Sequence, residues 1–170
     1  QVLPHPSNLE GLHGGPYETV FTASRLDGPK RLALLIGAYR RTRTRVPLCI
    51  AGDGPDAAHL RELAQGDPRI HFLGRLTDEQ LIEQYSRAAL VPFVPYMEDM
   101  GLITLEAMAC GKPVLTVSDA GGVTEFVRDG INGRIVPPTE KALAAVLDEL
   151  LADPQRLHAM GQAALETAAQ

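Results

Sequence analysis

The sequence predicts an α/β domain with a doubly wound, parallel β-sheet of the Rossmann-like kind. Short runs rich in apolar and β-branched residues alternate with helical patterns along the whole chain. Because helices of roughly 10–15 residues separate these runs, successive strands need crossover connections and should run parallel. The candidate ligand-binding residues all follow strands, and such sheets bind ligands beyond the carboxyl ends of their strands.

Six runs are the expected strands, each a short apolar or β-rich segment. They are Thr19–Ser24, Leu48–Ala51, Ile70–Leu73, Leu90–Pro95, Val114–Val117 and Gly133–Val136. The expected helices lie between and after them: Lys30–Thr42, Ala57–Gln65, Thr77–Ala88, Leu102–Ala109, Val123–Arg128, Glu140–Leu151 and Gln155–Ala168. Thr77 and Thr139 can cap their helices, and Pro154 should separate the last two.

Length and composition indicate a single domain and disfavour several partners. The chain has 170 residues, 45% of them hydrophobic and 22% charged, which is ordinary for a globular protein. Its net charge of -5 makes a nucleic-acid partner unfavourable. Two cysteines without paired spacing, Cys49 and Cys110, indicate reduced packing residues and a cytoplasmic setting. No apolar run approaches the roughly 18 residues that span a bilayer, and no signal peptide opens the chain.

The first 18 residues differ from the rest because proline and glycine punctuate them without any periodicity. We expect residues 1–18 to be an arm or interdomain linker and residues 19–170 to form the folded domain. A basic cluster, Arg40, Arg41, Arg43 and Arg45, falls where the first helix should end, and there cations complement the helix dipole. A solvated face is the favoured interpretation of this cluster.

The segment from Glu98 to Val114 is the most informative part of the chain. It predicts a loop carboxylate, a helix that begins near Gly101, and a second carboxylate, Glu106, inside that helix. A helix start offers unpaired backbone N–H groups, here of Met100, Gly101 and Leu102, and a partial positive charge that suits a phosphate. Carboxylates on either side can accept hydrogen bonds from hydroxyls. The pattern predicts a nucleotide-sugar site.

Three earlier loops, and one later loop, supply further candidates. Ser24–Lys30 carries Arg25 and Lys30, which can bind a diphosphate, although Arg25 could instead pair with Asp27 and Lys30 could face water. Gly52–Ala57, which includes Gly54, matches a dinucleotide fingerprint in letters, but a tight turn is an equal alternative. Phe72–Thr77 could bind a base beside Leu76 or could simply turn the chain. Ala120–Glu125 contains two glycines and offers a second place where a ligand can approach the backbone.

Taken together, these residues resemble the C-terminal, donor-binding domain of family-4 (group 1) glycosyltransferases of GT-B architecture. The resemblance runs from about Val20 to the end of the chain. It is carried, in order, by S-R-L…K, A-G-D-G-P, F-L-G, the Glu-x7-Glu element with G-L-I-T-L-E-A-M-A-C-G-K-P-V, and A-G-G-V-T-E-F-V-R-D-G-I-N-G. It implies a hexosyltransferase, retaining and independent of metal ions and cofactors, whose donor is a UDP- or GDP-linked sugar.

The resemblance also implies a role for each site residue. Arg25 and Lys30 would neutralise the donor diphosphate, and Glu98 would bind the sugar hydroxyls. The backbone at Met100, Gly101 and Leu102 would contact sugar and phosphates, Glu106 would accept from the ribose, and Leu76 would lie near the base. Three residues depart from the family pattern: Ser24 and Arg31 stand where glycine is usual, and Met100 stands where phenylalanine is frequent.

The full GT-B fold has an N-terminal domain that binds the acceptor, and 170 residues leave no room for it. We therefore expect a donor domain that is inactive by itself, with any acceptor or membrane contact made by the missing half. Three alternatives stay open. They are a nucleotide-sugar epimerase of the same architecture, a non-catalytic nucleotide-sugar-binding domain, and a nicotinamide-binding module.

Overall fold

The computed structural model describes residues 9–170 and contains one parallel sheet of six strands. The strands are β1 (Thr19–Ala23), β2 (Leu48–Ala51), β3 (Ile70–Gly74), β4 (Ala88–Pro92), β5 (Val114–Val117) and β6 (Gly133–Val136). Their order across the sheet is β3-β2-β1-β4-β5-β6. The chain reverses its direction of winding between β1 and β4, which is the topological switch point of this fold. The predicted fold class is confirmed.

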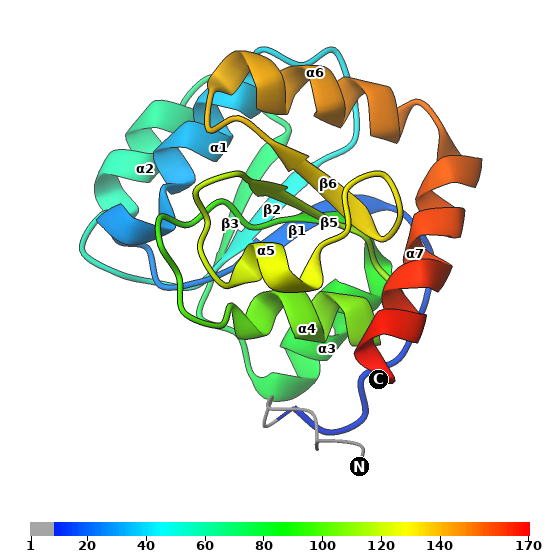
Figure 1. The fold of residues 1–170 in the computed structure, drawn as a ribbon. Helices are drawn as coiled ribbons and strands as arrows, with labels where there is room; N and C mark the ends of the chain where they lie inside the picture. Colours follow the sequence, from blue (N-terminus) through cyan, green and yellow to red (C-terminus); the bar gives the residue numbers. More distant parts are fainter. Residues whose placement is uncertain (1–8) are drawn as a thin grey trace.

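Helices cover both faces of the sheet (Figure 1). They are α1 (Leu32–Arg40), α2 (Ala57–Ala64), α3 (Asp78–Arg87), α4 (Leu102–Ala109), α5 (Val123–Phe126), α6 (Glu140–Leu151) and α7 (Pro154–Ala168). The helices α1, α2 and α6 pack together on one face, α3, α4 and α5 lie on the other, and α7 runs along the side against α4 and α6. Strands β1, β2, β4 and β5 are almost wholly buried, as expected when helices cover both faces.

Sequence signals for helix ends are confirmed where side chains cap the backbone. Thr77 and Gln80 form a reciprocal capping box at the start of α3. Thr139 caps α6 by accepting the N–H of Ala142, and Pro154 is the first residue of α7. These residues satisfy or remove N–H groups that would otherwise lack a partner.

Several predicted boundaries are wrong. The expected helix Lys30–Thr42 is a short 3-10 turn, Gly28–Lys30, followed by α1, because Arg31 has a left-handed backbone (φ 51°) that interrupts it. The expected strand Leu90–Pro95 is β4, which begins two residues earlier, directly after α3 ends at Arg87. The helix expected over Val123–Arg128 ends at Phe126.

Residues 9–18, part of the expected arm, pack against the domain. Lys112 is fully buried, and its Nζ donates to the carbonyl oxygens of Gly15 (2.9 Å) and Pro16 (3.1 Å). The ammonium also lies 4.0 Å from the ring centroid of Tyr17, which stacks on His158. Tyr17 in turn donates to the carbonyl of Gly111. The remainder of the expected arm, residues 1–8, lies outside the described residues.

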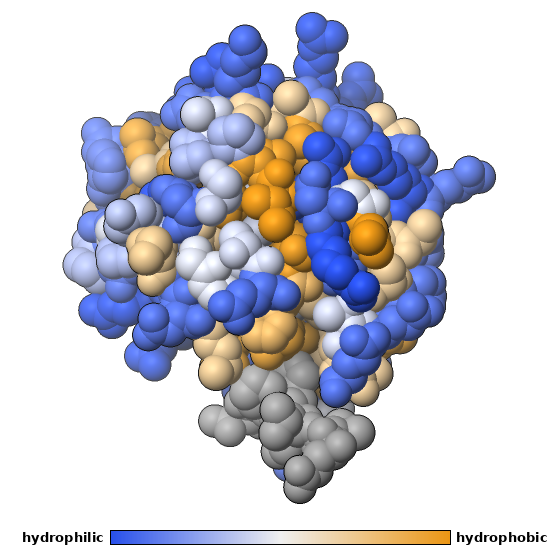
Figure 2. Space-filling view, viewed as in Figure 1, coloured by the Kyte–Doolittle hydropathy of each residue, from blue (hydrophilic) through white to orange (hydrophobic). Residues whose placement is uncertain are grey.

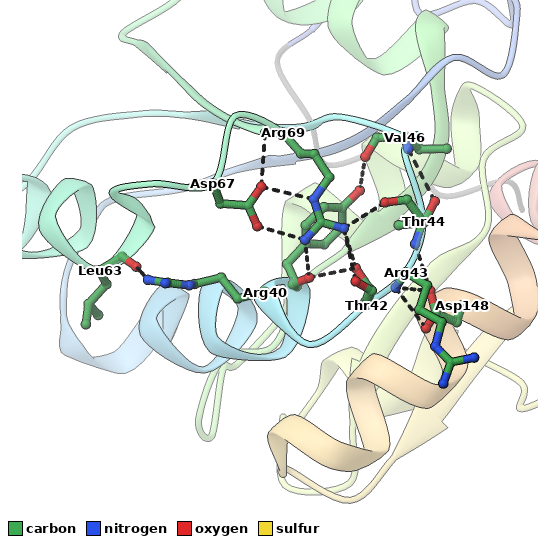
Figure 3. Close-up of polar contacts among 10 residues, drawn as sticks. Arg40, Thr42, Arg43, Thr44, Val46, Leu63, Asp67, Arg69 and Asp148 are labelled. Carbon is green, nitrogen blue, oxygen red and sulfur yellow. Dashed lines mark hydrogen bonds and ion pairs between the residues drawn. The ribbon is translucent and has the colours of Figure 1, made fainter.

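The basic cluster lies at the opposite end of the strands from the loops that carry the site candidates. Figure 3 shows a polar network there, centred on Arg69. Arg69 donates to the carbonyls of Tyr39, Thr42 and Thr44 and pairs with Asp67. These contacts of Arg69 connect the end of α1 to the start of β3. Within the cluster, Arg40 donates to the Leu63 carbonyl, whereas the Arg43 side chain points away from its neighbours. This network is structural and holds the turn before β2.

Hydrophilic side chains cover most of the face seen in Figure 2, and hydrophobic ones gather in a band near its middle. Within residues 9–170, no helix combines the length and the apolar character needed to cross a membrane. Exposed large hydrophobic residues concentrate in one short segment instead, where Tyr96, Met97, Met100 and Leu102 are each more than two-fifths exposed. This segment follows β4 and leads into α4.

Candidate functional site

Two adjoining hollows open where the strands β1, β2 and β4 end. The first, of about 540 Å³, is lined by Ala23, Ser24, Arg25, Ala51, Gly52, Asp53, Gly54, Arg75, Leu76, Leu81, Tyr85, Ile103 and Glu106. The second, of about 550 Å³, is lined by Ser24, Arg25, Lys30, Phe93, Glu98, Asp99, Met100, Gly101, Leu102 and Ile103. Ser24, Arg25 and Ile103 line both, so the two hollows adjoin along a shared wall and together form the cleft. The cleft lies at the switch point between β1 and β4, where this fold binds ligands.

Glu106 is the acidic group of the first hollow. It lies on α4, is 8% exposed, and its Oε2 accepts a hydrogen bond of 2.8 Å from the Tyr85 hydroxyl on α3. Burial, with the nearby carboxylate, raises the pKa of Tyr85 well above its ordinary value, so this hydroxyl remains a donor. A carboxylate can accept several hydrogen bonds. Glu106 is therefore held by Tyr85 while its side chain lines the hollow.

Backbone and apolar groups form the other walls of the first hollow. Gly54 packs so closely on the loop after β1 that a Cβ there would overlap the carbonyl oxygen of Leu26. A Cβ on Gly52 (φ 120°) would overlap the carbonyl oxygen of Ser24. Gly52 and Gly54 therefore allow the loops after β1 and β2 to pack closely together. Leu76, two residues after β3, also lines the first hollow.

The second hollow contains an ion pair between Lys30 and Glu98. Lys30 ends the 3-10 turn after β1, and Glu98 lies in the loop after β4, so the pair joins the two strands of the switch point. Their side chains are 21% and 26% exposed, and the Lys30 ammonium lies 5.6 Å from the Phe93 ring centroid. Lys30 thus contacts Glu98, whereas the sequence left open that it simply faces water.

Arg25 lies on the wall that the two hollows share. Its side chain is 67% exposed, and its Nε lies 3.1 Å from Oδ2 of Asp27. This pairing was one of the two interpretations open from the sequence. An exposed pair of this kind contributes little to stability, typically about 0–1 kcal/mol. Arg25 can therefore exchange Asp27 for a ligand anion at small cost.

The N-terminus of α4 forms one edge of the second hollow. Gly101 precedes the helix with φ 64°, and a Cβ there would lie 2.6 Å from Cγ2 of Val123 and 3.1 Å from the Phe93 ring. Only glycine fits this position, both for its torsion and for its space. No side chain caps the helix start, and the Thr104 N–H donates to the Gly101 carbonyl, so the amides before Thr104 are the ones that an anion could reach. Met100 and Leu102 flank it and are exposed.

The structure thus brings all nine sequence-predicted residues to one cleft. Gly54, Leu76 and Glu106 line the first hollow, Lys30, Glu98, Met100, Gly101 and Leu102 line the second, and Arg25 lines both. The loop Ala120–Glu125 lines neither hollow. Its Gly121 and Gly122 pack on the backbone of Glu98 and Asp99, so this loop supports the Glu98 loop from behind.

Sequence reasoning missed several residues of the cleft. Arg75 and Asp53 line the first hollow, Arg75 directly after β3 and Asp53 two residues after β2, and this position after a strand was a usable signal. The bond between Tyr85 and Glu106 joins residues 21 positions apart on different helices, and no sequence pattern indicates it. Among residues 9–170, no group of three or more His, Cys, Asp or Glu side chains is placed to hold a metal ion.

This geometry defines an α/β domain with a polar, phosphate-compatible cleft at its switch point. The profile of the family described as Glycosyl transferases group 1 matches residues 10–167. The chain belongs to this family, which confirms the resemblance read from its motifs.

Similar proteins span much longer chains. A GDP-mannose-dependent alpha-(1-6)-phosphatidylinositol monomannoside mannosyltransferase of Mycolicibacterium smegmatis is 33% identical over 163 residues, which cover 88% of this chain and 42% of that protein. An alpha-maltose-1-phosphate synthase of the same species is 31% identical over 158 residues, covering 84% and 41%. The chain therefore spans less than half the length of these relatives.

Solved structures agree with the family assignment. HepE of Anabaena, solved in complex with UDP and glucose, superposes with a TM-score of 0.81 at 29% identity, over 91% of this chain and 44% of that one. A sucrose-phosphate synthase from Thermosynechococcus elongatus gives a TM-score of 0.78 at 29% identity, over 89% and 40%.

Proposed function

We propose that this domain binds a nucleotide-diphospho-sugar and presents it for hexosyl transfer to an acceptor. One observation carries the proposal: two adjoining hollows share a wall at Arg25, with Glu106 in one and the Lys30–Glu98 pair in the other. A nucleotide-sugar has this order of groups, with a nucleoside, a charged diphosphate in the middle, and a hexose. The family and the UDP complex of HepE support the same assignment.

The nucleoside belongs in the first hollow. Glu106 is buried and held by Tyr85, so its carboxylate can accept the two ribose hydroxyls in a fixed orientation. Leu76 supplies an apolar wall for a base, and the close approach at Gly54 lets the ligand lie against backbone. The donor nucleotide in this proposal is UDP or GDP, because HepE is solved with UDP and the mannosyltransferase relative is named as GDP-mannose-dependent.

The diphosphate and the hexose belong at Arg25 and in the second hollow. Arg25 and Lys30 supply two cations, and the uncapped N-terminus of α4 at Gly101 adds oriented amides. When the bond between the sugar anomeric carbon and the diphosphate oxygen breaks, both electrons leave with the nucleoside diphosphate. These positive groups stabilise that charge, while Glu98 accepts hydrogen bonds from the hexose hydroxyls and orients the ring.

The wider activity rests on a longer protein. We propose a retaining, metal-independent transferase without a cofactor, whose acceptor is bound by a second domain, so that this chain alone transfers no sugar. Met100 and Leu102 line the second hollow with exposed side chains, and Tyr96 and Met97, also exposed, precede Glu98 in the same segment. Such a domain would close the cleft over this segment. The two free, buried cysteines support a cytoplasmic setting.

Binding is the first test. Thermal shift of this chain against UDP, GDP, ADP and NADH should show stabilisation by a nucleoside diphosphate, through mass action, and none by NADH. Glu106→Gln keeps an acceptor for Tyr85 but removes the charge, and should weaken binding by about 1–2 kcal/mol. Glu166→Gln, an exposed carboxylate on α7, is the control. Equal affinity of the Glu106 variant and the wild type would remove its proposed role.

Transfer is the second test. The longer protein should transfer hexose from UDP-glucose or GDP-mannose to an acceptor in the presence of EDTA. NMR of the product should show that the anomeric configuration of the donor is retained. A product that is an epimerised nucleotide-sugar would favour the epimerase of the same architecture. Tight donor binding with no turnover of any donor would favour a non-catalytic binding domain.

A further inference from the structure

The two partners of the Lys30–Glu98 pair lie beside the two strained residues of the domain. Within residues 9–170, Arg31 (φ 51°) and Met97 (φ 49°) are the only non-glycine residues with positive φ. Arg31 directly follows Lys30, and Met97 directly precedes Glu98. Left-handed backbone at such residues is unfavourable and persists only where the surroundings hold it, which is common at functional sites. At Arg31, the contacts that hold this backbone conformation come from its own side chain.

The Arg31 guanidinium spans three loops. Its Nε donates to the carbonyl of Val94 (3.0 Å) and its Nη2 to that of Pro95 (2.7 Å), both in the segment after β4. Its Nη1 and Nη2 also donate to the two carboxylate oxygens of Asp119, after β5, at 3.0 and 2.6 Å. These bonds place the start of α1, the β4 loop and the β5 loop in one fixed arrangement.

Backbone hydrogen bonds extend this arrangement as far as Glu98. The N–H of Tyr96 donates to Pro29 (2.9 Å), that of Met97 to Asp119 (3.0 Å) and that of Glu98 to Ala120 (3.0 Å). The Gly122 N–H then donates to the Glu98 carbonyl (2.8 Å). The N–H and the carbonyl of Glu98 thus both form hydrogen bonds with the loop that contains Asp119. Arg31 bonds to Asp119 and also to Val94 and Pro95, which precede Glu98 in the same segment.

Arg31 is not placed to bind the ligand itself. It lines neither hollow, and its bonds use the Nε donor, one Nη1 donor and both Nη2 donors, which are four of the five N–H groups of an arginine. Its guanidinium also lowers the pKa of Asp119, so the partner stays charged. The side chain therefore acts on other protein groups.

We infer that Arg31, through Asp119, is a positioning residue that fixes the Glu98 loop, so that the Glu98 carboxylate stays beside Lys30 at the sugar end of the cleft. This inference rests on the proposed function for its ligand, a nucleotide-sugar. It assigns a use to a residue that stands where the family usually has glycine. Glycine adopts a left-handed backbone without strain, but it supplies none of the bonds to Val94, Pro95 and Asp119.

Hydrogen exchange tests the loop without any ligand. In Arg31→Ala, Arg31→Gly and Asp119→Asn, the amides of Met97 and Glu98 should exchange about tenfold faster than in the wild type, because the loop opens more often. The amide of Val91, bonded to Pro113 inside the sheet, is the internal reference. Arg134→Ala is the matched control, since Arg134 has a similar exposed fraction and pairs with Asp129 and Glu149 elsewhere. Unchanged exchange at Met97 and Glu98 would overturn the inference.

Binding tests the consequence for the sugar. The variants should weaken binding of UDP-glucose or GDP-mannose about fivefold, whereas the affinity for uridine or guanosine should change less than about twofold, because no residue of this loop lines the first hollow. In the longer protein, kcat should fall more than KM rises. The inference is also overturned if the amides of Met97 and Glu98 exchange faster in the variants but the variants lose no more affinity for the nucleotide-sugar than for the nucleoside. If the wild type binds no nucleotide at all, the proposed function fails, and the exchange result still decides whether Arg31 holds the loop.

Discussion

Tyr85 donates its phenolic hydrogen to Oε2 of Glu106 over 2.8 Å, and both residues line the first hollow. In Tyr85→Phe the carboxylate loses a buried donor, so we expect the free energy of unfolding to fall by about 1–2 kcal/mol. The affinity for UDP or GDP should also fall, because Glu106 is no longer oriented. Urea unfolding and calorimetry measure the two effects.

Tyr39→Phe is the matched control for this prediction. Tyr39 is also fully buried, and its hydroxyl donates to the carbonyl of Val46, far from the cleft. It should lose a similar amount of stability and keep the wild-type nucleotide affinity. If both variants bind nucleotide as the wild type does, Tyr85 has no part in holding Glu106 for a ligand.

Gly101→Ala should impair both folding and phosphate binding. Alanine at φ 64° is strained by about 1 kcal/mol, and its Cβ would also lie 2.6 Å from Val123. The start of α4 must shift to relieve this overlap, which moves the amides at the edge of the second hollow. We expect a loss of roughly 2–3 kcal/mol in stability together with weaker binding of the nucleoside diphosphate.

Gly66→Ala separates strain from overlap. Gly66 has φ 87°, lies in the turn after α2, and a Cβ there meets no atom within 4 Å. This variant should lose only the strain energy, with unchanged nucleotide affinity. A Gly101 variant that is no less stable than the Gly66 variant would show that the crowding at Val123 is relieved without cost.

The six strands and the nine cleft residues were predictable because each strand and each loop motif carries its own local signal. Short apolar runs mark the strands, and glycine, arginine and carboxylate residues follow them directly. In a parallel sheet the carboxyl ends of adjacent strands lie together, so loops that are separate in sequence meet in one cleft without further information.

Long-range contacts account for what the sequence did not predict. Arg31 delays the start of α1 to Leu32, because its side chain bonds to residues 63 to 88 positions away and these bonds hold a left-handed backbone that no local signal favours. Residues 9–18 lack periodicity, yet they pack against the domain because Lys112 donates to the backbone carbonyls of Gly15 and Pro16. Ala88 and Ala89 suit a helix by propensity, yet pairing with β1 places them in β4.

Arg25→Ala should weaken binding of the diphosphate and change stability and nucleoside binding little. Its exposed pair with Asp27 contributes at most about 1 kcal/mol, so the unfolding free energy should stay within about 1 kcal/mol of the wild type. The affinity for UDP or GDP should fall far more than that for uridine or guanosine, because only the diphosphate needs the cation. Asp27→Asn frees the guanidinium and should leave diphosphate affinity equal or higher. Equal losses for nucleoside and nucleoside diphosphate would contradict the placement of Arg25.

Lys112 gives the chain a dependence of stability on alkaline pH. Burial lowers its pKa to about 8 in the folded state, against 10.5 for an exposed lysine. Between these values the unfolded chain binds more protons than the folded one, so the Lys112 contribution to stability rises with pH across this interval and is constant below it. The neutral amine retains two N–H donors, enough for the carbonyls of Gly15 and Pro16.

Lys112→Met isolates this contribution because other groups titrate in both proteins. We expect the difference in unfolding free energy, wild type minus variant, to be flat from pH 6 to about 7.5 and then to grow by about 1–3 kcal/mol up to pH 10.5. Urea unfolding at a series of pH values measures it. A difference that shrinks with rising pH would mean that the contacts with Gly15, Pro16 and the Tyr17 ring hold Lys112 as a cation more strongly than burial opposes it.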